Sequence, residues 1–576
     1  MSSEEEIRKQ ELLKKQHERQ QKKIAKDKRK KVYSDILIQG TNDSSIVSKR
    51  SVERYYTTVL ERKEDKQPPA EYFKHFVKKP QRRSPVINRG YWIRMEAIKT
   101  TVLKIVENSL PLKKINVINL GCGYDPLPFQ MLDQYKNTSW NFTTIDVDYP
   151  DLINNKCKMI DNSPELQDII DLKEKQVHDV NSPIQLRTES YAAVGCDLKN
   201  VDNFHKIMSE LGLDNQDSVS IFIAEVSLAY MLPQYADPVI KETSLFANSH
   251  FIILEQLLPA GVNHPFARTM LNHFNHLKAP IQCVETYPTI PHQFERFTSL
   301  GYTSVEATDL LGIWDYVVDA EVKKNISQIE AFDEWEEFML FCQHYIILHA
   351  TISNVTDLLP TNKLEPKKEN QKDSKISHVA KGKISIQQDA GKKDILKRKF
   401  IAGSNIDGDN FVITGGAFQS RLTDSVLLSS KETPFMIGKT KMSGRLSNSC
   451  VTLKDNTLYS FGGRSIPGRP LQDIWKLKHG EDKEFVWSKL TAELPEGRSK
   501  MSAVSVSETE ALIFGGSFTG ELFLKFSADD DSITPMKLAG DILTHKESPS
   551  MCWNSKSKSG VIFGGINQDE SIDRYL

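Results

Sequence analysis

The sequence lacks the patterns that would assign it to a metal-binding, secreted or membrane class. Its seven cysteines form no Cys-x-x-Cys pair, which argues against a zinc site and a disulfide framework. They occupy positions 122, 157, 196, 283, 342, 450 and 552. No apolar run reaches transmembrane length, and the charged N-terminus lacks the apolar core of a signal peptide. We therefore expect a protein of the reducing cytoplasm with neither a metal site nor a membrane segment.

The sequence also lacks a net charge and is too long for a single core. It carries 75 Lys and Arg against 76 Asp and Glu, a net charge of −1, so any basic surface for nucleic acid must be local. A chain of 576 residues should divide into two or more domains.

A third absence concerns a turn that would bind a dinucleotide. Residues 115–120 form an apolar run typical of a strand buried on both faces of a parallel sheet, and Gly121 and Gly123 follow it. The dinucleotide pattern G-x-G-x-x-G would need a third glycine where Pro126 stands, and proline cannot donate a backbone N–H to a pyrophosphate. A second predicted strand ends in Asp146 and Asp148, and such carboxylates suit a ribose diol. The pattern favours S-adenosylmethionine, which carries a nucleoside and no phosphate.

The segment between residues 95 and 350 alternates predicted strands with predicted helices. The helices include 96–109, 201–211 and 233–247, and the pattern predicts an α/β fold with a seven-stranded, doubly wound sheet. Two further strand ends carry acids, Asp197 and Glu225, so that four strand ends present a glycine turn or an acid to one edge. The strands are predicted near 115–120, 142–147, 191–195, 219–224, 250–255, 302–306 and 344–350.

The C-terminal region has a different pattern, with short strands that end in paired glycines. The pairs begin at Gly415, Gly462, Gly515 and Gly564, a repeat of about fifty residues that is typical of one kelch propeller blade. The chain stops soon after the fourth pair, so we expect an all-β propeller that is incomplete here or closes in an unusual way.

Composition predicts four regions along the chain. They are a basic N-terminal arm (1–40), the α/β domain expected to bind S-adenosylmethionine, with an N-terminal lid (41–358), a polar linker (359–395) and the propeller (396–576). The lid begins with a capped helix start near residue 41. The arm is basic, with twelve Lys or Arg over residues 7–32, and cations mix with aromatic residues over residues 72–94. Both segments suit contacts to RNA, and both equally suit an ordinary solvated surface.

Six ordered motifs resemble the leucine carboxyl methyltransferase family over roughly residues 40–350. The fused repeats are similar to a branch of that family that modifies tRNA, because the protein-phosphatase methyltransferases of the family lack a propeller. The motifs are Lys49-Arg50, Arg89-Gly90-Tyr91-x-x-Arg94, Asn119-Leu120-Gly121-Cys122-Gly123, Val147-Asp148-Tyr149-Pro150, Gly195-x-Asp197-Leu198 and Ala224-Glu225-x-x-x-x-Tyr230-Met231.

The resemblance implies a role for each matching residue, and it selects Asp148 over Asp146. Arg94 and Tyr230 become the candidates for catalysis. The implied cofactor contacts are Lys49 and Arg94 at the methionine carboxylate of S-adenosylmethionine, Gly121 beneath the cofactor, Asp148 on the ribose, Asp197 and Leu198 beside the adenine, and Glu225 at the floor of the site.

The resemblance further implies methyl transfer to the α-carboxylate of the wybutosine precursor next to the anticodon of phenylalanine tRNA. A second step would add a methoxycarbonyl group to the α-amine, with carbon dioxide as co-substrate and a second molecule of S-adenosylmethionine as the source of its methyl group. No metal is implied. A carboxylate acceptor is already ionised at neutral pH, so no general base is needed.

Two other functions remain open from the sequence. A carboxyl methyltransferase that acts on the C-terminal leucine of a phosphatase would not need the propeller or the basic lid. A non-enzymatic kelch scaffold would not need the glycine turn and the acids at the strand ends.

Overall fold

The computed structural model describes two compact units. One comprises Met1–Val318 and Glu334–Glu365, and the other comprises Asp319–Asp333 and Pro366–Leu576. The basic segment 7–32 and residues 361–393 of the predicted linker lie outside the described residues, and the predicted boundaries at 40, 358 and 395 stay predictions. The structure describes residues 35–568 without 58–59, 61–69, 110–113, 137, 139, 174–181, 354, 361–393, 397, 419, 430–433, 439, 467, 480–483, 538 and 540–542.

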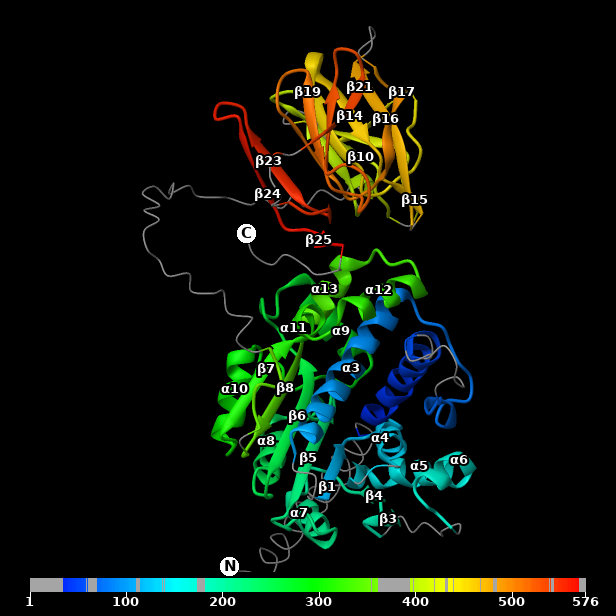
Figure 1. Ribbon diagram of the computed structural model, residues 1–576, viewed down its shortest axis with the longest axis vertical. Helices are drawn as coiled ribbons and strands as arrows, with labels where there is room; N and C mark the ends of the chain where they lie inside the picture. The colour runs from blue at the N-terminus through cyan, green and yellow to red at the C-terminus, as the bar shows by residue number, and fades with distance from the viewer. Residues whose placement is uncertain are drawn as a thin grey trace, which may run out of the picture. The chain divides into compact units, whose positions relative to one another are not determined.

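The first unit contains an eight-stranded sheet in the order β3-β4-β2-β1-β5-β6-β8-β7 (Figure 1). Strands β4, β2, β1, β5 and β6 are parallel, whereas β3 and β8 run antiparallel to their neighbours. The seven predicted strands are confirmed, and the four-residue edge strand β3 is an addition. The strands are β1 (Lys114–Leu120), β2 (Asn141–Asp148), β3 (Ile184–Arg187), β4 (Tyr191–Gly195), β5 (Ser218–Glu225), β6 (Ser249–Gln256), β7 (Ser304–Asp309) and β8 (Tyr345–Thr351).

Helices pack on the sheet because its strands are apolar on both faces. On one face α7, α8 and α10 share a core with β5 and β6, and α3, α11 and α13 pack against one another over β6 and β8. The helices are 35–52, α3 (Pro85–Glu107), α4 (Leu127–Tyr135), α5 (Pro150–Asp161), α6 (Pro164–Ile169), α7 (Val201–Glu210), α8 (Pro233–Thr243), α9 (Pro265–His276), α10 (Ile290–Ser299), α11 (Leu310–Tyr316) and α13 (Trp335–Gln343). Three single turns are η1 (Glu53–Thr57), η2 (Phe73–His75) and η3 (Leu228–Tyr230).

One prediction about the N-terminal segment is wrong, and two residues of the segment 72–94 are unavailable for the RNA contact that was left open there. No helix starts near residue 41, because residues 35–52 already form one helix. Helix α3 begins at Pro85, where proline suits the first turn, and it buries part of the predicted RNA-contacting mixture. Arg89 is fully buried, with its guanidinium 5.5 Å and 4.9 Å from the ring centres of Trp314 and Trp335. Trp92 is buried as well, so neither residue is free to meet a base or a phosphate.

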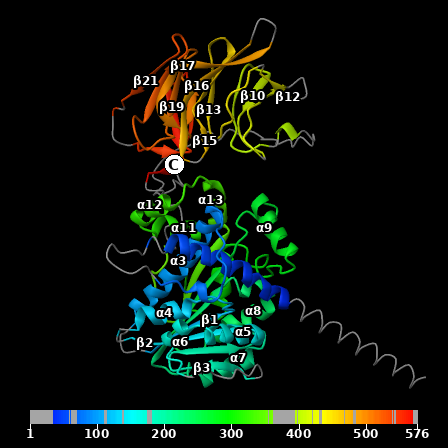
Figure 2. The ribbon, with the colours of Figure 1, turned by 90° about the vertical axis from the view of Figure 1, so that its right-hand side faces the viewer.

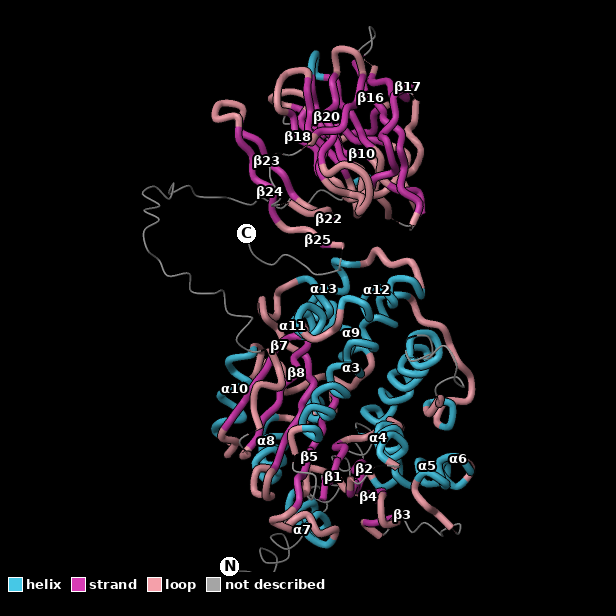
Figure 3. Tube along the Cα trace, in the orientation of Figure 1, coloured by secondary structure: helices cyan, strands magenta, loops and turns pink. Residues whose placement is uncertain are grey.

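The second unit consists of strands and loops apart from α12 (Ala320–Ile329) and short turns (Figure 3). Three sheets of four or five strands follow one another (Figure 2). Strand β13 lies between β9 and β18, and β18 in turn contacts β23. The strands are β9 (Ala402–Asn405), β10 (Asn410–Thr414), β11 (Ser425–Ser429), β12 (Phe435–Ile437), β13 (Ser449–Leu453), β14 (Thr457–Phe461), β15 (Arg464–Ile466), β16 (Arg469–His479), β17 (Phe485–Arg498), β18 (Ser502–Ser505), β19 (Glu510–Phe514), β20 (Phe523–Ser527), β21 (Ser532–Met536), β22 (Lys546–Glu547), β23 (Ser550–Asn554), β24 (Ser559–Phe563) and β25 (Ile566–Asn567).

Each paired glycine adopts a left-handed conformation that other residues resist. In the second pair, Gly462 has φ +49° and Gly463 has φ +94°. A Cβ on Gly462 would lie 2.4 Å from the carbonyl oxygen of Arg498. The repeat that marked the blades in the sequence therefore reflects a turn that needs glycine.

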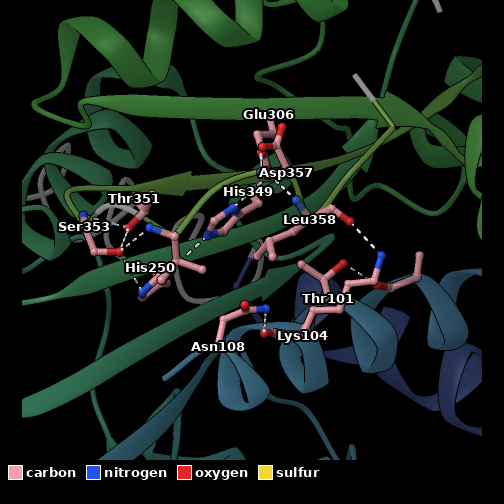
Figure 4. Close-up of polar contacts among 12 residues, drawn as sticks. Thr101, Lys104, Asn108, His250, Glu306, His349, Thr351, Ser353, Asp357 and Leu358 are labelled. Atoms are coloured by element: carbon pink, nitrogen blue, oxygen red, sulfur yellow. Dashed lines mark hydrogen bonds and ion pairs between the residues drawn. The ribbon is translucent and has the colours of Figure 1, made fainter. Parts of the chain in front are cut away.

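A buried polar network joins β6, β7 and β8 (Figure 4). His250 Nδ1 lies 2.9 Å from His349 Nε2, and His349 Nδ1 lies 3.3 Å from Glu306 Oε2. Glu306 also accepts hydrogen bonds from the backbone N–H groups of Asp357 and Leu358, which fixes the chain after β8. Burial, helped by the neighbouring His349, lowers the pKa of His250 to about 3. The His250 ring is therefore neutral in the folded protein at neutral pH.

Acid should destabilise the first unit through His250. The unfolded ring has the ordinary pKa of 6.5 and binds a proton that the folded ring excludes, so stability present above pH 6.5 is lost as the pH falls. Between pH 6.5 and pH 5 we expect a loss of about 1.5 kcal/mol from this ring. Calorimetry of the full chain at both pH values should show a smaller acid effect in His250→Gln than in the wild type. The exposed control His292→Gln should behave as the wild type, and an undiminished acid effect in His250→Gln would contradict the assignment.

Candidate functional site

A cavity of about 960 Å³ opens in the first unit where the parallel strands end. The ends of β1, β2, β4 and β5 line it, and helix 35–52 and α3 add side chains from the N-terminal segment. The cavity brings together all eight residues that the sequence singled out. These residues are Lys49, Arg94, Gly121, Asp148, Asp197, Leu198, Glu225 and Tyr230.

The turn after β1 requires its two glycines. Gly121 has φ +67° and Gly123 has φ +51°, both in the left-handed region. A Cβ on Gly121 would lie 2.3 Å from the Cβ of Ser227, and one on Gly123 would lie 2.2 Å from Asn42 Oδ1. A side chain at position 121 would therefore require Ser227 to move, and one at position 123 would require the Asn42 side chain to move.

Asp146 and Asp148, two residues apart on β2, have different environments. Asp146 is fully buried, 2.6 Å from Lys156 Nζ, and it accepts a 2.8 Å hydrogen bond from the Tyr191 hydroxyl. Asp148 lines the cavity and accepts hydrogen bonds from the backbone N–H groups of Gly123 at 2.8 Å and Tyr149 at 2.7 Å. Spacing left both acids open as ligand contacts, and in the structure Asp148 alone of the two faces the cavity.

Glu225 holds two cations at the floor of the cavity. Its Oε1 lies 2.7 Å from Arg94 Nη2 and its Oε2 lies 2.6 Å from Lys49 Nζ. Burial alone would raise the pKa of Glu225, but Lys49 and Arg94 outweigh burial and lower it. Lys49 also pairs with Asp125, which the sequence analysis did not single out. The cluster stays ionised at neutral pH and presents two cations to a ligand.

Aromatic rings surround the guanidinium of Arg94. Its centre lies 4.7 Å from the Tyr91 ring and 5.4 Å from the Tyr345 ring. Arg94 Nε is buried and has no hydrogen-bond partner among the described residues. Nearby, burial raises the pKa of Tyr230 to about 12, so its hydroxyl keeps its proton and can donate a hydrogen bond at neutral pH.

Helix 35–52 covers one side of the cavity, and sequence reasoning missed most of its contacts. Asp35 Oδ1 lies 3.1 Å from both the Tyr149 hydroxyl and Lys199 Nζ. Asn42 Oδ1 accepts a 3.1 Å hydrogen bond from the backbone N–H of Tyr124 in the glycine turn. Such long-range pairs leave no local signal in the sequence. Only Lys49 was identified there, through its motif.

The donor set fits S-adenosylmethionine. The glycine turn leaves room for a close approach of a ligand, the Asp148 carboxylate suits a diol, and the unpartnered Arg94 Nε can still donate a hydrogen bond. Among the described residues no group of His, Cys, Asp and Glu is arranged to hold a metal ion. Within the same residues no helix is long and apolar enough to cross a bilayer.

Two family models match the chain. One, described as leucine carboxyl methyltransferase, matches residues 20–244. The other, described as tRNA wybutosine-synthesizing protein 4, beta-propeller, matches residues 442–576. The predicted fold class, a methyltransferase sheet followed by a propeller, is thereby confirmed, and the assignment of the propeller to the kelch type stays a prediction.

Curated relatives match along nearly the whole chain. The tRNA wybutosine-synthesizing protein 4 of Candida albicans is 44% identical over 95% of this chain and 79% of that protein. The protein of the same name from Saccharomyces cerevisiae is 36% identical over 96% of this chain and 80% of that protein. A solved geranyl diphosphate methyltransferase is 9% identical over 45% of this chain and 78% of that chain, with a TM-score of 0.27, which is too low to support any argument.

Substituting the first glycine of the turn should abolish cofactor binding. In Gly121→Ala the new methyl group would collide with Ser227 in addition to the cost of a positive φ. The matched control is Gly212→Ala, where φ is +84° but nothing lies within 4 Å of the added Cβ. Isothermal titration with S-adenosylmethionine should show no binding to Gly121→Ala. The control should bind normally and lose about 1 kcal/mol of stability. Wild-type affinity in Gly121→Ala would contradict the placement of the cofactor at this turn.

Proposed function

The chain belongs to the tRNA wybutosine-synthesizing protein 4 family, and from that premise we propose that its first unit methylates the α-carboxylate of the wybutosine precursor in tRNA. The methyl donor in this proposal is S-adenosylmethionine. The observation that carries the proposal is the cavity in which the glycine turn, Asp148 and the Lys49–Glu225–Arg94 cluster meet.

Each predicted residue has a place in the proposed complex. Asp148 would accept hydrogen bonds from the ribose, and Asp197 and Leu198 would flank the adenine. Lys49 and Arg94 would bind the methionine carboxylate above Glu225, while Gly121 would leave space beneath the cofactor. The support for these roles is that all of these side chains or backbone atoms line one cavity.

The chemistry asks little of the protein beyond positioning. When bound, S-adenosylmethionine supplies an electrophilic methyl group. The acceptor carboxylate is ionised at neutral pH, so no residue must remove a proton from it. Arg94 would orient the acceptor through its planar guanidinium, and the protonated Tyr230 hydroxyl would donate a hydrogen bond to it. The walls of the cavity would exclude water and hold the reacting atoms in line.

We extend the proposal to the finer substrate. The acceptor would be phenylalanine tRNA, beside the anticodon. In a second reaction the α-amine would take up carbon dioxide as a carbamate, and a second S-adenosylmethionine would methylate the carbamate to give the methoxycarbonyl group. The resemblance to the tRNA-modifying branch supports both points. Cytoplasmic location likewise remains a proposal, which rests on scattered cysteines.

A test uses the full chain, S-adenosylmethionine and tRNA that carries the unmethylated precursor. Mass spectrometry of the digested nucleosides should show the gain of one methyl group, and bicarbonate should add the mass of a methoxycarbonyl group. A peptide that ends in leucine serves as the competing acceptor, because one matching model is a leucine carboxyl methyltransferase. Methylation of the peptide and not of the tRNA would overturn the proposal in favour of a protein substrate, and failure to bind S-adenosylmethionine would favour a scaffold.

Arg94 should matter more for turnover than for cofactor affinity. Arg94→Lys keeps the charge beside Glu225 but loses the planar fork, so kcat should fall by at least about tenfold while the Kd for S-adenosylmethionine changes less. Arg94→Ala should abolish methyl transfer. The matched control is Arg187→Lys, because Arg187 lies in the first unit but does not line the cavity. We expect this variant to have wild-type kinetics. Normal turnover in Arg94→Ala would remove this residue from the site.

A further inference from the structure

Helix α9 exposes an apolar face to the cavity. Phe266, Met270, Phe274 and Leu277 recur at intervals of four, four and three residues, so they share one face, and all four line the cavity. We call these four residues the apolar wall. In α9 itself Ala267 is the one buried residue, and Leu277 just beyond it is 44% exposed. Phe266, Met270 and Phe274 are half-buried, and the last two also pack against a small buried cluster that includes Ala267, so the apolar wall is anchored on one side and borders the cavity on the other.

Apolar side chains also line the cavity from other elements. Ile36 of helix 35–52 is 57% exposed and Ile87 of α3 is 40% exposed, and both line the cavity. A Cβ on Gly40 would meet nothing within 4 Å, so this part of helix 35–52 borders open space. Apolar groups from three helical segments thus border the same cavity. A ligand that covered them would bind more tightly, in proportion to the apolar area removed from water.

The apolar wall is continuous with the charged part of the site. Phe274 meets the Tyr230 ring edge to face, with ring centres 6.0 Å apart, and Tyr230 lines the cavity together with Arg94. The polar half of the cavity is already assigned to the cofactor by the proposed function. A volume of about 960 Å³ lies at the upper end for ligand pockets and leaves room for a second molecule beside the cofactor.

We propose that the apolar wall receives the modified base itself, turned out of the anticodon loop, and selects it by its apolar bulk over an unmodified guanine. This inference rests on the proposed function, which places the acceptor carboxylate near Arg94. A base whose side chain is to be modified is commonly unstacked and held against aromatic side chains, because every base has an apolar face that can stack. Phe266 and Phe274 provide such rings beside the acceptor position.

The experiment measures KM and kcat for precursor tRNA and the Kd for S-adenosylmethionine in the full chain. Phe274→Ala and the milder Leu277→Ser should each raise KM, the first by at least about tenfold, the lower range for a lost stacking contact. The Kd for S-adenosylmethionine should stay within about twofold of the wild type, since the wall lies beside the cofactor residues. The matched control is Leu245→Ser, because Leu245 is 67% exposed and does not line the cavity; its kinetics should equal the wild type.

Competition by unmodified tRNA tests the selectivity. It should compete at least about tenfold more weakly than precursor tRNA against the wild type, and this difference should shrink in both wall variants. Active wild type with unchanged KM and unchanged competition in both variants would overturn this inference alone. An inactive wild type on precursor tRNA, or activity on the leucine peptide only, would overturn the proposed function and this inference with it.

Discussion

The first unit depends on one buried carboxylate that is shared by two cations. Glu225 ends a central strand, and it is paired with Arg94 from α3 and Lys49 from helix 35–52. A carboxylate can leave water only if its charge is matched at short range, so the N-terminal segment must come down onto the sheet to complete the cluster. The cluster therefore joins the lid to the floor of the cavity, beside the contacts that Asp35 and Asn42 make from the same helix. Removing Glu225 would leave the buried Arg94 without the carboxylate it pairs with, whereas removing either cation would leave Glu225 paired with the other.

The acids on β2 show how one strand serves structure and site together. Side chains that are two residues apart point to the same face, yet Asp146 sits deeper, between Lys156 and Tyr191. Asp148 lies at the very end of the strand, where the backbone N–H of Gly123 in the glycine turn donates a hydrogen bond to its Oδ2. The deeper pair fixes the strand end, and the outer carboxylate is then held where a ligand can reach it. Asp146 thus neutralises the buried Lys156, and Asp148 remains available to a ligand in the cavity.

Local sequence signals made it possible to predict the sheet and the residues at its strand ends. The pairings between residues distant in the sequence could not be predicted. Apolar runs marked seven strands, and the glycine turn and acids marked where they end; β3 escaped because Ile184–Arg187 is too short to show a pattern. The same mixture of cations and aromatics describes an exposed RNA-binding face and the buried Arg89 between two tryptophans, because composition does not record burial. The Lys49–Glu225 pair spans 176 residues, and the wall on α9 faces the cavity only once the chain has folded. Family motifs supplied Lys49 and Arg94, and no signal in the sequence marked Phe274.

In the second unit, the residues that recur in the repeats have a structural role. They form hydrogen bonds within and between the blades. Arg398, Arg445 and Arg498 each donate a hydrogen bond to the carbonyl of the glycine 17 residues later, and Arg445 also forms a two-pronged pair with Asp473, with both contacts at 2.8 Å. The second glycine of the first three pairs donates its N–H to the next repeat, as Gly463 does to the Arg498 carbonyl at 2.8 Å. At the corresponding position of the fourth repeat stands Lys546, whose carbonyl accepts the N–H of Gly516 and whose Nζ donates a 2.7 Å hydrogen bond to Asn567 Oδ1. A residue whose side chain is buried in these hydrogen bonds is not available to bind a ligand. The repeat signature therefore predicts the blades and leaves the ligand to be sought in the loops, where the repeats differ.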